Sequence, residues 1–375
     1  MPASRPRPRG TIRVGSVAGS DVLVSGSWFL VAALIAVLVA PRAELVQPGL
    51  GGWAYVAGFV FAVLLYGSVL LHEASHAVVA KRYGFTVSSI TLHFLGGMTA
   101  IEGEARKPRQ EFWIAVVGPL TSIAVGLGAL ALLLVTPDGL PRLAVEALAA
   151  ANLLVGVLNL VPGLPLDGGR VLKSAVWRLS GDPHRGTVVA GWGGRATAVL
   201  MLGWPLLLQY GLGRTPQLVD YLLAFVIAVF LWSGANAAMA AARVRRRLPG
   251  LAARSLARRS IAVPAPTPLA EAVRRAQEAE AGGIVTLDAD GHPAGLVDEA
   301  ALLAVPAERR PWVPVSTVAR TLTDAATMPA GLVGEGLVAA LGRAPAPTYL
   351  VVEDDGRIHG VLVTGDVERA FRALP

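Results

Sequence analysis

The chain has 375 residues, of which 54% are hydrophobic and only 16% are charged, and its mean hydropathy is +0.56. A soluble domain has about a quarter charged residues, so this composition excludes an ordinary soluble protein and predicts an integral membrane protein. The absence of cysteine excludes disulfides, thiolate nucleophiles and cysteine-held metals. The net charge of +7 is distributed over the ends of apolar runs rather than along one stripe, so we expect a lipid bilayer as partner and no nucleic acid.

Residues 1–20 form a basic segment, which we expect to be retained rather than cleaved as a signal peptide. Six apolar runs follow, each near the roughly 20 residues that cross a bilayer; they cover residues 22–40, 52–80, 112–135, 143–164, 188–212 and 221–242. The fifth run contains Arg195 and fits the pattern least well. With the amino terminus inside, 17 Lys and Arg residues lie on the inner segments and three on the outer ones. The positive-inside rule therefore predicts a multi-pass protein of the plasma membrane with both termini in the cytoplasm.

Between the second and third runs, FTVSSITLHFLGGMTAIEGEA (85–105) is rich in β-branched residues and contains Gly96-Gly97. This pattern predicts a β-hairpin that turns at the two glycines. Unpaired backbone is not tolerated in lipid, so a hairpin that dips into the membrane must pack against protein or line a cavity. An ordinary cytoplasmic hairpin is the alternative. We expect Glu102, Glu104 and Glu111, which follow it, to be solvated charges at the interface.

The uncharged run GWAYVAGFVFAVLLYGSVL (52–70) ends in LHEASHA (71–77). On a helix, His72 and His76 lie one turn apart on the same face, so both imidazoles can reach one cation, and Glu73 lies beside them. A structural polar cluster is the alternative. Ionisable groups are costly in a membrane helix and usually face a partner or a water-filled cavity, so the pattern favours a catalytic zinc site, which needs a third protein ligand.

The stretch NLVPGLPLDGGR (159–170) supplies a candidate for that ligand at the inner end of the fourth run. Asp167 is its only carboxylate, and the surrounding prolines and glycines interrupt regular helix, so the carboxylate is able to turn toward a neighbour. An Asp-Gly turn at a helix end is the alternative. The second and fourth runs both lead inward, so Asp167 and the two histidines are expected near the same face of the membrane.

Taken together, HEASH in one membrane helix, NLVPGLPLDGG near the end of a later one, and VGPLTS (117–122) in the third run resemble the site-2 protease family of intramembrane zinc metalloproteases. The resemblance covers the membrane half of the chain. It implies that His72, His76 and Asp167 bind one zinc ion and that Glu73 is general base and later proton donor. It also implies that Asn159 holds the substrate carbonyl or stabilises its oxyanion; an interhelical hydrogen bond is the alternative for this residue. The hairpin also resembles the family, whose edge strand is suited to pairing with an unwound segment of the substrate.

After RVRRRLPG (243–250) the sequence changes to a soluble α/β pattern in which helix, strand, Asp/Gly turn, strand and helix occur twice, about 60 residues apart. We therefore divide the chain into segments 1–20, 21–242 (membrane domain), 243–254 (basic linker) and 255–375. The last segment resembles a CBS-domain pair, most clearly in GVLVTGDVERA (360–370). The resemblance implies adenine-nucleotide contacts at Thr364 and Asp366, but the first repeat, GLVDEAALL, lacks the threonine, so a structural or homodimerising role stays open.

The predicted fold class is thus a polytopic α-helical membrane protein of about six transmembrane helices with a membrane-associated β-hairpin, followed by a cytoplasmic α/β CBS pair. The resemblance implies a zinc-dependent intramembrane endopeptidase that cleaves single-pass membrane proteins such as anti-sigma factors. A transporter or channel regulated by its CBS pair is the rival hypothesis, because intramembrane His and Asp also line ion paths. The six runs show no inverted repeat, which counts against the rival.

Overall fold

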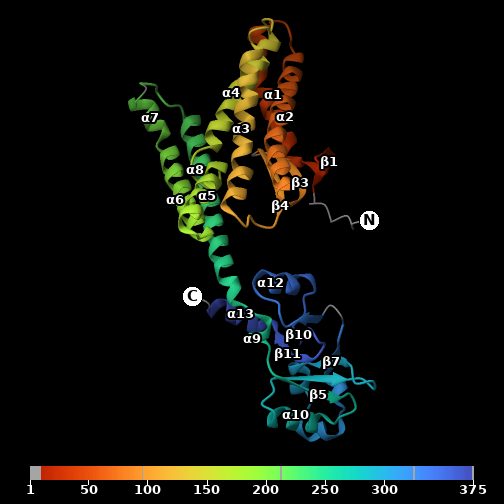
Figure 1. Cartoon of the computed structure of the whole chain (residues 1–375). Coiled ribbons are helices and arrows are strands. Elements are labelled where there is room, and N and C mark those ends of the chain that lie inside the picture. Colours follow the sequence, from red (N-terminus) through yellow and green to blue (C-terminus); the bar gives the residue numbers. More distant parts are fainter. Residues whose placement is uncertain (1–9, 95, 212, 324–325, 374–375) are drawn as a thin grey trace. The chain divides into compact units, whose positions relative to one another are not determined.

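The computed structural model describes residues 10–94, 96–211, 213–323 and 326–373, and the chain divides into two compact units (Figure 1). We call Met1–Ala242 the membrane unit and Arg243–Pro375 the C-terminal unit. The helices that begin in the membrane unit are α1 (Gly26–Val46), α2 (Trp53–Arg82), α3 (Pro108–Leu132), α4 (Leu140–Asn159), α5 (Asp167–Ser180), α6 (Pro183–Leu202), α7 (Trp204–Gly211) and α8 (Leu218–Arg247).

Among the described residues, the five helices α1, α2, α3, α4 and α8 are long and apolar enough to cross a membrane. Their packing faces carry small side chains, such as Ala36 and Ala62 with 7% and 0% exposure, which allow the helix backbones to approach closely. Large apolar side chains lie on the outside, as Leu30 and Leu134 do with 74% and 88% exposure. A helical bundle with an apolar exterior suits lipid as the surrounding solvent, and the predicted membrane fold is confirmed.

The fifth predicted run, 188–212, differs from the prediction of one continuous span. It is divided between α6 and α7, which are separated at Gly203, and its last residue lies outside the described part. Arg195 is accommodated in α6 because its guanidinium donates to Asn236 Oδ1 of α8 at 3.0 and 2.7 Å. The same guanidinium lies over the rings of Trp192 and Trp232, at 4.6 and 5.1 Å from their centroids. Figure 1 shows α6 and α7 leading the chain away from α5 before α8 returns.

One end of the helical bundle carries a four-stranded sheet in the order β1-β2-β3-β4, formed by Thr11–Val17, Ser20–Ser25, Thr86–His93 and Gly96–Glu102. Strands β3 and β4 are the predicted hairpin, but they close at the His93–Gly96 pair, so Gly97 lies inside β4 rather than in the turn. The hairpin β1–β2 was not predicted: residues 22–25 belong to β2 instead of the first span, and β2 pairs parallel to β3. The sheet thus joins the amino-terminal segment to the end of α2.

The C-terminal unit repeats one arrangement twice, as its sequence predicts. Its elements are a 3-10 turn (Leu248–Gly250), α9 (Ala253–Leu256), β5 (Ser260–Pro264), α10 (Leu269–Glu278), β6 (Gly283–Leu287), β7 (Pro293–Val297), α11 (Glu299–Leu303), 3-10 turns at Ala307–Trp312 and Val315–Val318, β8 (Ala319–Thr321), β9 (Thr327–Pro329), α12 (Gly334–Arg343), β10 (Thr348–Val352), β11 (Ile358–Val363) and α13 (Thr364–Ala373). Two sheets result, β5-β6-β7-β8 and β11-β10-β9. Buried Val285, Leu296, Leu350 and Val361 join the repeats in one cluster. The segment 243–247, predicted as linker, continues α8.

Candidate metal centre

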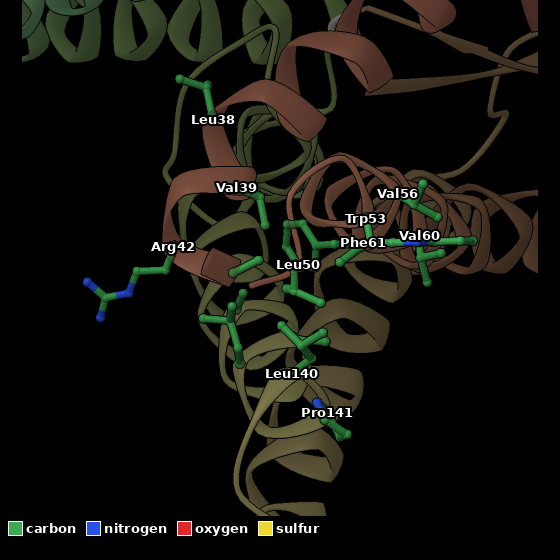
Figure 2. Close-up of a pocket in the computed structure, with 15 residues that line it drawn as sticks. Leu38, Val39, Arg42, Leu50, Trp53, Val56, Val60, Phe61, Leu140 and Pro141 are labelled. Carbon is green, nitrogen blue, oxygen red and sulfur yellow. The ribbon is translucent and has the colours of Figure 1, made fainter. Parts of the chain in front are cut away.

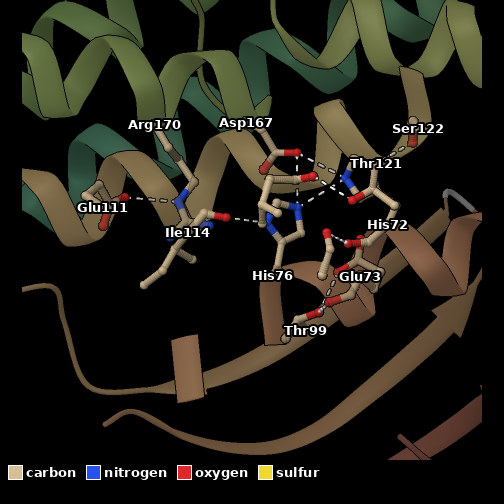
Figure 3. A network of polar contacts seen from close by, with 12 residues as sticks. His72, Glu73, His76, Thr99, Glu111, Ile114, Thr121, Ser122, Asp167 and Arg170 are labelled. Atoms are coloured by element: carbon tan, nitrogen blue, oxygen red, sulfur yellow. Dashed lines mark hydrogen bonds and ion pairs between the residues drawn. The ribbon is translucent and has the colours of Figure 1, made fainter. Parts of the chain in front are cut away.

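Three predicted ligands come together from two helices that are far apart in the sequence. His72 and His76 lie one turn apart on α2, and both are buried, with 6% and 4% exposure. Asp167 is the first residue of α5, directly after the proline- and glycine-rich segment that ends α4. Figure 3 shows the carboxylate of Asp167 directed at the two imidazole rings. The structure therefore brings Asp167 to the histidines, as the inward direction of the second and fourth runs suggested.

The three ligand atoms form a nearly equilateral triangle. His72 Nε2 and His76 Nε2 are 3.2 Å apart, and Asp167 Oδ2 lies 3.2 Å from the first and 3.3 Å from the second. Ligands at the zinc distance of about 2.0–2.1 Å in a tetrahedron lie about 3.3–3.4 Å from one another, so the triangle has the dimensions of one tetrahedral face. The donor set of two imidazoles and one carboxylate is also one that zinc takes in catalytic sites.

The hydrogen bonds on the far side of each ring direct the Nε2 lone pairs into this triangle. His76 Nδ1 donates to the backbone carbonyl of Ile114 at 2.5 Å, so the Nε2 of the neutral ring is unprotonated. His72 Nδ1 lies 2.9 Å from Ser122 Oγ, which can accept its proton in the same way. Two lone pairs and a carboxylate then converge without a proton between them, which is unfavourable unless a cation lies there. These partners from α3 are what a metal site needs to fix ring orientation.

Gly118 keeps the open side of the triangle free. A Cβ at this position would lie 2.2 Å from His76 Nε2 and 2.7 Å from His72 Nε2, so any larger residue would occupy the place where the three ligands converge. Gly118 belongs to the VGPLTS segment of α3. The residues present therefore fit a bound zinc ion, with α3 supplying both the space and the outer hydrogen bonds.

The carboxylate of Glu73 is held by β4 rather than by the metal ligands. Thr99 Oγ1 donates to Glu73 Oε2 at 2.6 Å and also lies 3.1 Å from the Glu73 backbone oxygen. A Cβ at Gly97 would lie 2.3 Å from Glu73 Cγ, so only glycine lets β4 approach this side chain. Thr99 was not predicted as a site residue, because the local sequence does not indicate that β4 contacts Glu73 of α2, which lies 26 positions earlier.

The structure contradicts the prediction made for Glu111. It was expected as a solvated interface charge, but its side chain is buried, with 7% exposure. Arg170 Nε donates to Glu111 Oε1 at 3.0 Å, and Lys173 Nζ lies 3.6 Å from the same oxygen. The burial is possible because both cations come from the face of α5 that packs against α3, so the carboxylate exchanges water for two positive partners.

Among the described residues, the remaining predicted site residues make no hydrogen bond or ion pair with this network. Asn159 is the last residue of α4 and is half-buried. In the C-terminal unit, Thr364 Oγ1 donates to the carbonyl of Ala346 at 2.7 Å. Asp366 accepts two hydrogen bonds from Arg258, at 2.6 and 3.1 Å, which hold the pKa of its carboxyl below the usual value. A cavity of 190 Å³ is lined by Arg258 but by neither Thr364 nor Asp366.

The chain is similar in sequence to a known peptidase family and to curated metalloproteases. Residues 60–140 and 138–202 match the model of peptidase family M50. A putative zinc metalloprotease of Synechocystis is 38% identical over 198 residues, which are 51% of this chain and 52% of that protein. The chain spans about half the length of the curated relatives that it matches.

Two solved structures are also similar. A site-2 protease from Methanocaldococcus jannaschii is 25% identical, covers 61% of this chain and 95% of its own, and has a TM-score of 0.42. A CBS-domain protein from Thermoplasma acidophilum is 20% identical, covers 32% of this chain and 72% of its own, and has a TM-score of 0.25.

Proposed function

We propose, from the match of residues 60–140 and 138–202 to the model of peptidase family M50, that this chain is a zinc-dependent intramembrane endopeptidase. The observation that carries the proposal is the triangle of His72, His76 and Asp167, with edges of 3.2–3.3 Å, beside Glu73. The substrates proposed are membrane segments of single-pass proteins, with anti-sigma factors as one class.

In this mechanism His72, His76 and Asp167 would hold one zinc ion. Zinc would supply Lewis acidity for the scissile carbonyl and lower the pKa of water to about 7. Glu73, oriented by the 2.6 Å hydrogen bond from Thr99, takes a proton from the attacking water and returns it to the leaving nitrogen. The Asn159 amide, at the end of α4, donates to the developing oxyanion, a contribution worth about 100- to 1000-fold in rate for a donor of this kind.

The edge of the sheet supports the mode of substrate binding. Among the described residues, β4 pairs with β3 and has no strand on its other side. A membrane helix has its carbonyls in hydrogen bonds and must unwind before attack, and strand addition to an edge holds a peptide extended. Since β4 contributes Thr99 and Gly97 to the surroundings of Glu73, a segment paired with β4 would run past the base.

We propose that the end of the bundle bearing the sheet faces the cytoplasm of the plasma membrane. The count of Lys and Arg supports this orientation, with 17 on the inner segments of the predicted topology against three outside. Both termini and the C-terminal unit would then be cytoplasmic. The basic ends of α2 and α8, with Lys81, Arg82 and Arg245 to Arg247 in their last turns, agree with it.

The decisive experiment co-expresses the wild-type chain and its Glu73→Gln variant with single-pass candidate substrates, and detects a cut inside the membrane segment. We expect cleavage to disappear in the variant while zinc content persists, because Glu73 is not a ligand. Cleavage at the wild-type rate by the variant would refute the mechanism. Zinc analysis separates the rival transporter: about one zinc per chain, lost in His72→Ala, His76→Ala and Asp167→Ala, supports the protease.

For the C-terminal unit we propose a CBS pair that modulates proteolysis by binding an adenine nucleotide beside Arg258. The support is the 190 Å³ cavity that Arg258 lines together with residues of both repeats, Asp298 and Glu299 among them, since a guanidinium suits phosphate oxygens. Homodimerisation through this unit is the alternative. Thermal unfolding of the full chain with AMP, ADP or ATP tests the proposal, with Arg258→Gln as the variant that should lose any stabilisation. A shift that survives in Arg258→Gln would contradict it.

A further inference from the structure

A second cavity in the membrane unit lies between the first turns of α3 and the last turns of α5. It has a volume of 390 Å³, and its lining includes Arg109, Phe112 and Trp113 from α3 with Ser174 and Arg178 from α5. The α3 residues recur at helical spacing, so they share one face of that helix. None of the lining residues is acidic. The cavity therefore combines two guanidinium groups with two aromatic rings.

Both arginines are available to a ligand. Within the described part of the chain, neither Arg109 nor Arg178 has an ion pair or hydrogen bond to its side chain. The carboxylate nearest in sequence, Glu111, is buried on the other side of the α3 turn and is engaged by Arg170 and Lys173. Two exposed cations with no internal carboxylate leave a local positive potential that an anion would neutralise.

The depth of these groups indicates which anion. Because α3 starts at Pro108 and is long and apolar enough to cross a membrane, we expect Arg109, in its first turn, at the level where the helix enters the bilayer. Trp113 lies four residues further along, which is about 6 Å deeper at 1.5 Å per residue. Cationic groups at headgroup level above aromatic rings at the acyl boundary match the two ends of a phospholipid.

We propose that this cavity binds an anionic phospholipid, with the phosphate at Arg109 and Arg178 and the upper acyl chain against Phe112 and Trp113. The site would fasten α5, the helix that begins with Asp167, to the start of α3, which carries the carbonyl partner of His76. Binding of this lipid rests on the membrane location of the chain but not on its proteolytic activity, so it can fail or succeed independently of the proposed function.

A larger cavity elsewhere in the membrane unit is apolar and differs from the cavity at Arg109 and Arg178. It has a volume of 620 Å³ and is lined by α1, α2 and α4 and the α1–α2 connection, with Trp53, Phe61 and Leu140 among its residues (Figure 2). Its single lining cation, Arg42, points away from the other lining side chains in Figure 2. That cavity has the apolar part of a lipid site without a converging cationic part, so Arg42→Gln serves as the matched control.

The test measures tryptophan quenching by brominated lipids in vesicles of the full-length protein. Dibromo-phosphatidylglycerol is compared with dibromo-phosphatidylcholine, and Trp113→Phe assigns the Trp113 signal among the eight tryptophans. We expect phosphatidylglycerol to quench Trp113 preferentially, with apparent affinity falling about fivefold for each of Arg109→Gln and Arg178→Gln. Arg42→Gln should leave the preference unchanged, and Arg109→Lys and Arg178→Lys should retain most of it.

Three results would overturn the proposal. The first is equal quenching of Trp113 by the two lipids. The second is a preference that survives in the Arg109→Gln/Arg178→Gln double variant. The third is displacement of phosphatidylglycerol by millimolar inorganic phosphate, which would assign the site to a soluble anion. Should the double variant fail to fold, the two lysine variants and the single glutamine variants keep the comparison intact.

Discussion

The ion pair between buried Glu111 and Arg170, whose side chain is 31% exposed, connects the α3 turn that carries the carbonyl partner of His76 with the α5 turn that begins at Asp167. Glu111 lies three residues before Ile114, whose carbonyl accepts from His76 Nδ1, and Arg170 lies three residues after Asp167 on α5. Figure 3 shows the pair beside the ligand triangle. We predict that Glu111→Gln will destabilise the membrane unit and weaken zinc binding, although no Glu111 atom touches the ligand atoms.

The magnitude follows from the geometry and burial of the pair. Opposite charges about 4 Å apart attract by about 4 kcal/mol at an effective dielectric constant near 20. Removing one partner of a fully buried pair costs about 3–5 kcal/mol, but the Arg170 side chain is 31% exposed and stays partly hydrated when Glu111 loses its charge. Glutamine also keeps one oxygen acceptor for Arg170, so we expect a cost of about 2 kcal/mol, between the values for exposed and for fully buried pairs. Loss of outer support for metal ligands lowers affinity about 10- to 100-fold, which we expect for zinc here.

The assay compares Glu111→Gln with Glu146→Gln in detergent, by thermal unfolding and by zinc competition against a chelator. Glu146 is also paired with an arginine, Arg142 at 3.0 Å, but its side chain is 50% exposed, so its removal should cost only about 0–1 kcal/mol. Arg170→Lys, which keeps the charge, should fall between them. Equal unfolding temperatures and equal zinc affinities for Glu111→Gln and Glu146→Gln would refute the reasoning.

Three further predictions concern single contacts. Thr99→Val removes the 2.6 Å hydrogen bond to Glu73 and should lower kcat about tenfold or more with zinc content unchanged; loss of zinc instead would place Thr99 in the metal site. Gly118→Ala puts a methyl group 2.2 Å from His76 Nε2 and should lower zinc affinity about 10- to 100-fold, measured by the same chelator competition; unchanged affinity would contradict the position inferred for the metal. The pKa of Asp366 is lowered by its hydrogen bonds from Arg258, so this carboxylate contributes stability above about pH 4 that is lost as pH falls through its folded value. Asp366→Asn should flatten the acid dependence of C-terminal unfolding in that window; an unchanged profile would show that the pair contributes nothing.

The parts of the site that were predictable from sequence are those with a local pattern. His72, Glu73 and His76 follow the period of one helix, and Asp167 stands out as the only carboxylate in a segment that interrupts helix. The outer partners have no such pattern. His76 binds a backbone carbonyl, which any residue offers, and Ser122 and Thr99 are ordinary polar residues until tertiary packing brings them 2.9 Å from His72 and 2.6 Å from Glu73.

The amino-terminal strands show a different reason for failure. Residues 22–25 are apolar and continue directly into α1, so hydropathy alone assigns them to the span. The turn at Ala18–Gly19, where both residues have positive φ, instead folds them back as β2, and the parallel pairing with β3 joins segments more than 60 residues apart. A hydropathy window detects burial in lipid, but it does not distinguish it from burial in a sheet.

The burial of Glu111 had a signal in the sequence that the prediction did not use. Asp167 and Arg170 are three residues apart on one helix, so they lie on the same face, and a face that turns Asp167 toward the histidines also turns Arg170 into the protein. A guanidinium that is largely withdrawn from water favours a carboxylate partner, because an unpaired charge there is costly. The acidic residue nearest to the start of the third run is Glu111. If each charge on the face of α5 that carries Asp167 needs a partner, then Glu111 is predicted to be buried. The local sequence around Glu111 alone does not give this prediction.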